Sequence, residues 1–163
     1  IAYQQVFDLP YTMVRPSALY GPRCVSRRVG QIFIENALRS DVLKVEGDGS
    51  QKLDFTYIDD LVEGVKLVIT NPAARNETFN MTYGQGRSLQ ELASLVVKEF
   101  PDSRVEYIPR DKLMPIRGTL SIKKARDLLG YAPAVPIEQG ISRYIEWYRE
   151  LNDATPDNRT PSA

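Results

Sequence analysis

Few residues of this chain could carry chemistry on their own. It has no histidine, which excludes Ser-His-Asp and Cys-His nucleophile systems and every zinc site that uses histidine. Its single cysteine, Cys24, can form neither an intrachain disulfide nor a thiolate cage. Asp59 and Asp60 could bind a metal ion, but adjacent carboxylates before an apolar helix are more often a cap. Four cations could meet an anion or could be ordinary surface charges: Lys52, Arg110, Lys112 and Arg117.

Two glycine-rich segments are more typical of turns than of phosphate loops. Gly47-Asp48-Gly49 is predicted to form a hairpin turn, and residues 84–86 a turn before a capped helix. Neither segment has the G-x-G-x-x-G or Walker spacing. The residues alone therefore give no complete catalytic constellation and leave the function undecided.

Composition narrows the class of protein. A length of 163 residues predicts roughly one domain. Hydrophobic residues make up 42% and charged residues 26%, as in ordinary globular proteins. The 21 basic residues balance the 21 acidic ones. This balance disfavours a nucleic-acid partner, because a protein that binds nucleic acid normally carries an excess of basic residues to neutralise the phosphates. The lone cysteine and the absence of a signal-like apolar run at the start indicate a reducing, cytoplasmic location.

Short helices and strands must position any site. Apolar residues recur at helical spacing in segments 1–7, 29–40, 59–71, 88–99, 123–129 and 136–151. Strand-like runs occupy 11–15, 42–46, 53–58, 78–81 and 104–108. The second and third runs are expected to be joined by the Gly47–Ser50 turn, and the first helix to be the end of one that began earlier. This alternation predicts an α/β class, although it is too irregular for a complete doubly wound sheet.

Helix boundaries follow from capping residues. Asp59 and Asp60 are expected to cap the third helix, and the spacing from Ser88 to Glu91 predicts a capping box. Gly130 is expected to close the helix before it. The tail 152–163 has little to bury and is expected to be disordered.

Four collinear segments change this interpretation. They are residues 15–23 (RPSALYGPR), 47–60 (GDGSQKLDFTYIDD), 79–92 (FNMTYGQGRSLQEL) and 117–133 (RGTLSIKKARDLLGYAP). Together they resemble the C-terminal, substrate-binding half of an extended short-chain dehydrogenase/reductase. Within that family, the chain is most similar to the NAD-dependent nucleotide-sugar epimerases and dehydratases of the UDP-glucose 4-epimerase kind. The resemblance covers residues 1–149, and residues 1–151 are expected to form this substrate-binding region.

The resemblance implies a two-part enzyme, in which an N-terminal Rossmann unit holds NAD or NADP. The Gly-rich turn, the catalytic Ser/Thr and the Tyr-x-x-x-Lys pair would lie upstream of Ile1, because Tyr3 has Phe7 and not lysine four residues later. This chain would then contain no catalytic residue and would not turn over substrate on its own. Its part would be to bind a nucleotide-diphospho-sugar and orient the sugar C4 toward the nicotinamide. A homodimer of the intact protein, and self-association of this portion alone, are also expected.

Matching positions give the expected site residues. On the cofactor side they are Pro16, Ser17 and Leu19; on the substrate side they are Arg28, Val29, Lys44, Val45, Gln51 and Arg117. The helix start at Val29 would offer free N–H groups to the diphosphate, and a planar guanidinium at Arg117 suits phosphate oxygens. The backbone of residues 44–46 would read the base. On this hypothesis Arg117 and the helix start at Val29 must face one concavity.

Three positions depart from the family pattern. Ala18 replaces an asparagine that binds substrate, Glu46 stands where relatives often have an aromatic residue, and Leu53 replaces an arginine that binds the diphosphate. The departures at Ala18 and Leu53 leave open a second hypothesis, a non-catalytic nucleotide-sugar or NAD(P)-binding regulatory protein of the same fold. A self-sufficient carbohydrate-binding domain is a third, less favoured reading, because the first helix lacks a beginning.

Overall fold

The computed structural model describes residues 2–24 and 26–154. The helices are α1 (Ala2–Phe7), α2 (Val29–Leu38), α3 (Ile58–Thr70), α4 (Leu89–Glu99), α5 (Lys123–Leu129) and α6 (Ile137–Ala154), with a 3-10 turn at Pro72–Ala74. The strands are β1 (Thr12–Arg15), β2 (Leu19–Tyr20), β3 (Leu43–Glu46), β4 (Lys52–Leu53), β5 (Thr56–Tyr57), β6 (Glu77–Asn80), β7 (Arg87–Ser88) and β8 (Val105–Ile108). Short strands alternate with helices, so the predicted α/β class is confirmed.

The strands pair over long sequence distances. β1 pairs with β6, β2 with β5 and β3 with β8, all in parallel, whereas β4 pairs with β7 in the antiparallel sense. The expected hairpin between 42–46 and 53–58 is therefore wrong. The partner of β3 is β8, about 60 residues later in the chain. The run 53–58 is divided between β4, β5 and the start of α3, and the fully buried Asp54 lies between the two strands.

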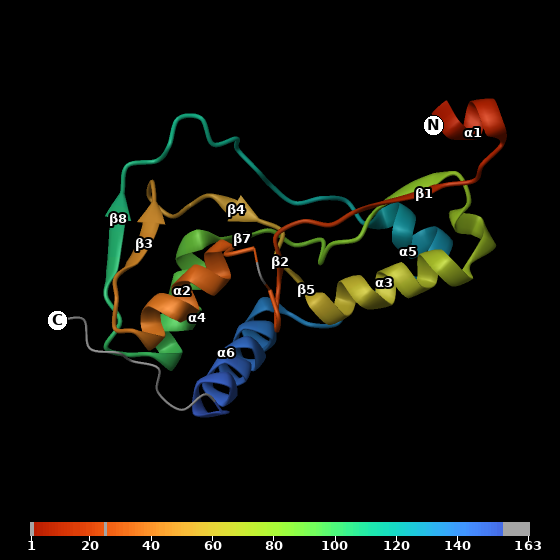
Figure 1. The fold of residues 1–163 in the computed structure, drawn as a ribbon. Coiled ribbons are helices and arrows are strands. Elements are labelled where there is room, and N and C mark those ends of the chain that lie inside the picture. Colours follow the sequence, from red (N-terminus) through yellow and green to blue (C-terminus); the bar gives the residue numbers. More distant parts are fainter. Residues whose placement is uncertain (1, 25, 155–163) are drawn as a thin grey trace.

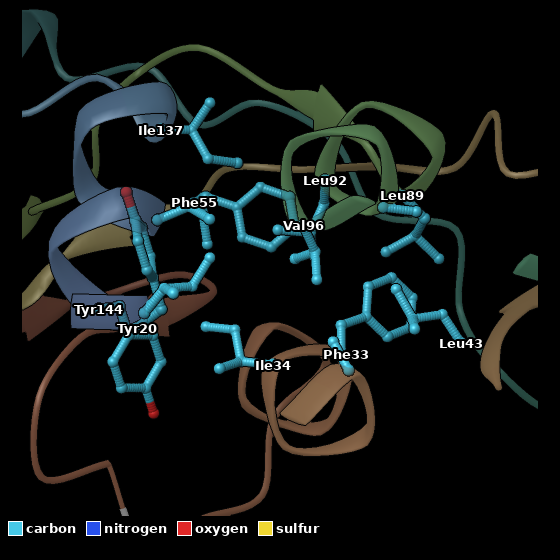
Figure 2. Packing of buried hydrophobic residues seen from close by; sticks show 14 of the residues in the cluster. Tyr20, Phe33, Ile34, Leu43, Phe55, Leu89, Leu92, Val96, Ile137 and Tyr144 are labelled. Carbon is cyan, nitrogen blue, oxygen red and sulfur yellow. The ribbon is translucent and has the colours of Figure 1, made fainter. Parts of the chain in front are cut away.

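Figure 1 shows α2, α4 and α6 on one side of the ribbon and α3 and α5 on the other, and each group of helices packs around its own hydrophobic cluster. The larger cluster lies among α2, α4 and α6, where Phe33 and Ile34 meet Leu92 and Val96 (Figure 2). The smaller one lies beside α3 and α5 and contains Phe79, Met81 and Tyr131. Helix α6 contributes its predicted apolar stripe to the larger cluster, and all of its members are buried: Ile137, Ile141, Tyr144, Ile145 and Tyr148.

Two predicted helix boundaries are confirmed and one is wrong. Ser88 accepts from the Glu91 amide and the Glu91 carboxylate accepts from the Ser88 amide, which completes the capping box. Gly130 ends α5 in the left-handed region, at φ 70°. Helix α3 instead begins at Ile58 with no side-chain cap. Asp60 is turned inward, where a different pair of amides needs an acceptor: it accepts from Ala134 N and Val135 N at 2.8 and 3.1 Å.

The helices at the two ends of the described chain, α1 and α6, bear on two of the sequence predictions. Helix α1 buries none of its residues, and Tyr3, Val6 and Phe7 are exposed; a partner for this helix stays a prediction. Helix α6 continues to Ala154, past the start of the expected tail, whose remainder, 155–163, lies outside the described residues. No helix in the described part of the chain is long and apolar enough to cross a membrane.

Candidate functional site

A pocket of about 330 Å³ opens at the N-terminal end of α2. Its wall includes six of the predicted site residues: Leu19, Arg28, Val29, Lys44, Gln51 and Arg117. These residues come from β2, the start of α2, β3, the turn before β4, and the irregular segment between β8 and α5. Arg117 and the helix start at Val29 thus face the same concavity, as the sequence hypothesis requires.

The start of α2 leaves its first amides available. Arg28 is the N-cap residue in an extended conformation, and no side chain caps the helix. The first turn contains no acidic residue, so the N–H groups at this end attract negative charge from outside the chain. A Cβ built on Gly30 would meet nothing within 4 Å. A ligand can therefore approach the backbone closely here.

Three cations surround the opening. Arg28, Lys44 and Arg117 are exposed, and the Arg28 Nε donates to Ser26 Oγ at 3.0 Å. Among residues 2–24 and 26–154, none of the three forms an ion pair. Glu46 also lines the pocket and is the acidic member of its wall. Three positive charges against one negative charge give the opening a net preference for anions.

The floor of the pocket is apolar. It is formed by side chains that also belong to the larger core cluster or pack against it: Phe33, Leu53, Phe55 and Leu89. The sequence could not assign these residues to a site, because a core residue and a pocket-floor residue share one apolar pattern. Met114, in the exposed segment before Arg117, also lines the pocket and carried no signal in the sequence.

Three predicted residues lie outside the pocket wall. Pro16 and Ser17 are in the loop that leads from β1 into β2, exposed and half-buried respectively. The Val45 side chain is fully buried in the core because alternate residues of β3 face inward, so only its main chain is available to a ligand. Its neighbour Glu46 lines both this pocket and a second hollow of about 390 Å³. The second hollow also includes Gln51 and Arg117 in its wall, so the two adjoin.

The phenol of Tyr20, which lines this pocket, is not suited to proton abstraction. Burial raises the pKa of Tyr20, and the neighbouring Tyr57 and Asp60 raise it further, so its phenol stays protonated at neutral pH. No cluster of three or more histidine, cysteine or acidic side chains that could hold a metal ion occurs in residues 2–24 and 26–154. The three cations, unpaired within the described residues, and the uncapped start of α2 suit this pocket to an anionic ligand.

Comparison with known proteins gives the pocket a context. Residues 1–82 match the NAD dependent epimerase/dehydratase family. An uncharacterised UDP-glucose epimerase of Bacillus subtilis is 30% identical over 91% of this chain and 48% of its own length. Other curated relatives are UDP-glucuronic acid decarboxylases and a dTDP-glucose 4,6-dehydratase. The chain spans about a third to a half of the length of these relatives.

Solved structures give the same result. UDP-glucose 4-epimerase of Thermotoga maritima, solved with UDP-glucose, has a TM-score of 0.84 and 30% identity over 92% of this chain and 49% of its own. UDP-glucuronic acid 4-epimerase of Bacillus cereus, in complex with UDP-glucuronic acid and NAD, has a TM-score of 0.86 and 26% identity over 92% and 48%. The fold of the chain is thus the Rossmann-like α/β fold of these enzymes, over about half of their length.

Proposed function

Since the chain belongs to the NAD-dependent epimerase/dehydratase family, we propose that its pocket binds a nucleotide-diphospho-sugar and orients the sugar for the reaction of the intact enzyme. The relatives in this family are NAD-dependent enzymes that act on nucleotide sugars as epimerases, dehydratases and decarboxylases. The pocket of this chain has the charge and shape for the part of such a substrate that does not react.

One observation carries the proposal: Arg28, the start of α2 at Val29, and Arg117 line one pocket from two sides. A diphosphate carries its negative charge on oxygens that accept both from backbone N–H groups at a helix start and from a guanidinium fork. Because these cations have no acidic partner within the described chain, little competes with a ligand for them. The diphosphate would thus be held between α2 and Arg117.

The remaining wall suits the other parts of the substrate. Gln51 offers an amide that both donates and accepts hydrogen bonds to sugar or ribose hydroxyls. Phe33, Leu53 and Phe55 exclude water beneath the ligand. Holding the substrate by its non-reacting portion converts an encounter of two molecules into an oriented, effectively unimolecular arrangement. The contribution of this chain to the rate is therefore binding energy used for orientation.

On this proposal, NAD meets the described residues at one edge of the pocket. Leu19 lines the pocket beside Ala18, and the loop before it presents Pro16 and Ser17; none of these side chains carries a charge that would hold the cofactor's phosphates. We infer that Pro16, Ser17 and Leu19 lie against the nicotinamide, and that the rest of the cofactor is bound outside this chain. When bound, NAD accepts a hydride from a sugar carbon.

Titration calorimetry of the intact protein with its NAD tests the proposal. UDP-, dTDP-, GDP- and CDP-sugars are the ligands. At least one is expected to bind, and Arg117→Ala should weaken that binding about tenfold or more, because a charge-assisted contact of ~1.5–3 kcal/mol is lost. Arg126→Ala removes the same charge from an exposed site on α5 outside the pocket and should leave the affinity unchanged. No binding of any sugar nucleotide, or equal affinities of the two variants, would refute it.

A second candidate is a non-catalytic binding protein of the same fold. It is favoured by Ala18 and Leu53, which place hydrocarbon in the pocket wall where the family pattern has polar groups. Turnover separates the two candidates. Binding with conversion of the sugar supports the enzyme, whereas binding at the same affinity with no conversion supports the regulatory protein.

A further inference from the structure

Asp54 has an unusual position for a carboxylate. It lies between β4 and β5, its exposed fraction is 0%, and its two oxygens accept three hydrogen bonds. The donors are Thr82 Oγ1 at 2.9 Å, Gly84 N at 3.0 Å and Leu120 N at 3.1 Å. This side chain therefore joins three segments that are distant in sequence: its own, residues 82–84, and the segment that ends at Leu120.

Of these three segments, the one ending at Leu120 carries the pocket arginine. Residues 109–119 form no helix or strand and are exposed throughout, and Arg117 lies three residues before Leu120. A second contact ties the same segment down, since the Gly86 amide donates to Thr119 Oγ1 at 2.8 Å. An exposed segment without regular structure loses much conformational entropy when it is held in one place. Its few anchors therefore decide where Arg117 lies.

The anchor and the pocket belong to the same stretch of chain. Leu53 and Phe55, on either side of Asp54, form part of the pocket floor. Asp54 thus connects the floor directly to the segment whose Arg117 forms one wall. A shift of the segment relative to Asp54 would move the guanidinium relative to the start of α2.

We propose that Asp54 is a positioning residue for Arg117, holding its guanidinium at the pocket wall before ligand arrives. The proposal rests on the proposed function, because it takes Arg117 to be the diphosphate contact. An arginine that is already in place loses less entropy on binding than one that must first be ordered. Loss of Asp54 should therefore weaken the binding of a nucleoside diphosphate through Arg117 and not by a separate route.

Asp60 provides a matched control within the same chain. It is also a buried aspartate whose two oxygens accept backbone amides, those of Ala134 and Val135. Neither of these residues lines the pocket. Asp54→Ala and Asp60→Ala both leave buried amides without their acceptor and should both destabilise the fold, but only the first releases the segment that carries Arg117.

The test is a double-mutant cycle on the intact protein, with UDP as the ligand in calorimetry. Asp54→Ala is expected to weaken UDP binding about tenfold in the wild-type background and less than about twofold when combined with Arg117→Ala. Asp60→Ala should bind UDP as the wild type does. Hydrogen exchange of the ligand-free protein adds an independent readout: Asp54→Ala should speed exchange of amides 109–120, and Asp60→Ala should not.

Each outcome bears on one claim. If Asp54→Ala weakens binding equally with and without Arg117, or leaves exchange of 109–120 unchanged, the positioning role is overturned. If Arg117→Ala itself binds UDP normally, the proposed function fails, and the exchange measurement alone still decides whether Asp54 anchors the segment. Should Asp54→Ala fail to fold, Thr119→Val removes the exposed anchor on Gly86 N. This variant should show the same coupling to Arg117→Ala, and its absence would overturn the proposal.

Discussion

A close approach between helix α6 and Tyr20 gives a stability prediction that the structure makes quantitative. A Cβ added at Gly140 would lie 2.8 Å from Tyr20 Cζ and 3.0 Å from Tyr20 Cε2, and nearer still to its hydroxyl. Both residues are buried. Forcing a methyl group into a packed core costs about 1–3 kcal/mol. The better helix propensity of alanine returns up to about 1 kcal/mol, so Gly140→Ala should lose up to about 3 kcal/mol and should be about 1–3 kcal/mol less stable than an alanine variant at an unobstructed helix glycine.

Chemical denaturation measures this loss, and two variants isolate its cause. For a domain of this size 1 kcal/mol corresponds to about 2–4 °C in Tm, so Gly140→Ala should melt several degrees lower. Gly30→Ala, in α2, adds a methyl that meets nothing within 4 Å and should be neutral or slightly stabilising. The Tyr20 hydroxyl has no hydrogen-bond partner among the described residues. Tyr20→Phe should therefore keep or raise the stability of the wild type and partly rescue Gly140→Ala.

The result that would refute this reasoning is specific. If Gly140→Ala and Gly30→Ala unfold at the same denaturant concentration, α6 does not lie against Tyr20 as described. If Tyr20→Phe is clearly less stable than the wild type, its hydroxyl has a partner and the packing explanation is wrong.

Three further predictions concern capping, pH and salt. Ser88→Ala should lower the free energy of unfolding by about 1 kcal/mol because α4 loses its cap, whereas Ser94→Ala, inside the same helix, should not; equal losses would contradict this. The hydrogen bond from Arg87 holds the pKa of Glu138 below its ordinary value of 4.5. The pair therefore stabilises the fold above that pH and stops doing so as the pH falls through the lower folded-state value. Because Glu138 is half-exposed, Glu138→Gln should reduce the stability difference between pH 7 and pH 3 by less than about 1 kcal/mol, and thermal melts that show no reduction would refute the bridge. Finally, UDP affinity measured by calorimetry should fall as salt is raised, since the cations at the pocket are exposed, and a salt-independent affinity would count against them.

Local features of the fold could be predicted from the sequence because their causes are local. The Ser88–Glu91 box and the Gly130 closure each depend on residues a few positions apart, and the apolar stripe of α6 depends on one helical period. Strand pairing is different. β3 pairs with β8, about 60 residues later in the chain, and nothing in the pattern of either strand identifies its partner.

Asp54 and Asp60 show a second limit. The sequence predicts Asp60 as a cap residue and places Asp54 within a strand-like run, and only the fold reveals that both turn inward to accept distant amides. The candidate site, too, could be predicted only in part. The resemblance predicts that Arg117 and Val29 face one concavity, and both line the pocket; their role in binding stays a prediction. The apolar floor stayed invisible, because Phe33 and Leu89 have the periodicity of ordinary core residues.

A crystal structure of the intact protein with NAD and UDP would test the central claim most directly. The account predicts the diphosphate between the N-terminal end of α2 and Arg117, with phosphate oxygens within about 3 Å of the guanidinium and of the amides at the start of the helix. A diphosphate bound elsewhere, or an Arg117 side chain turned away from it, would contradict the account.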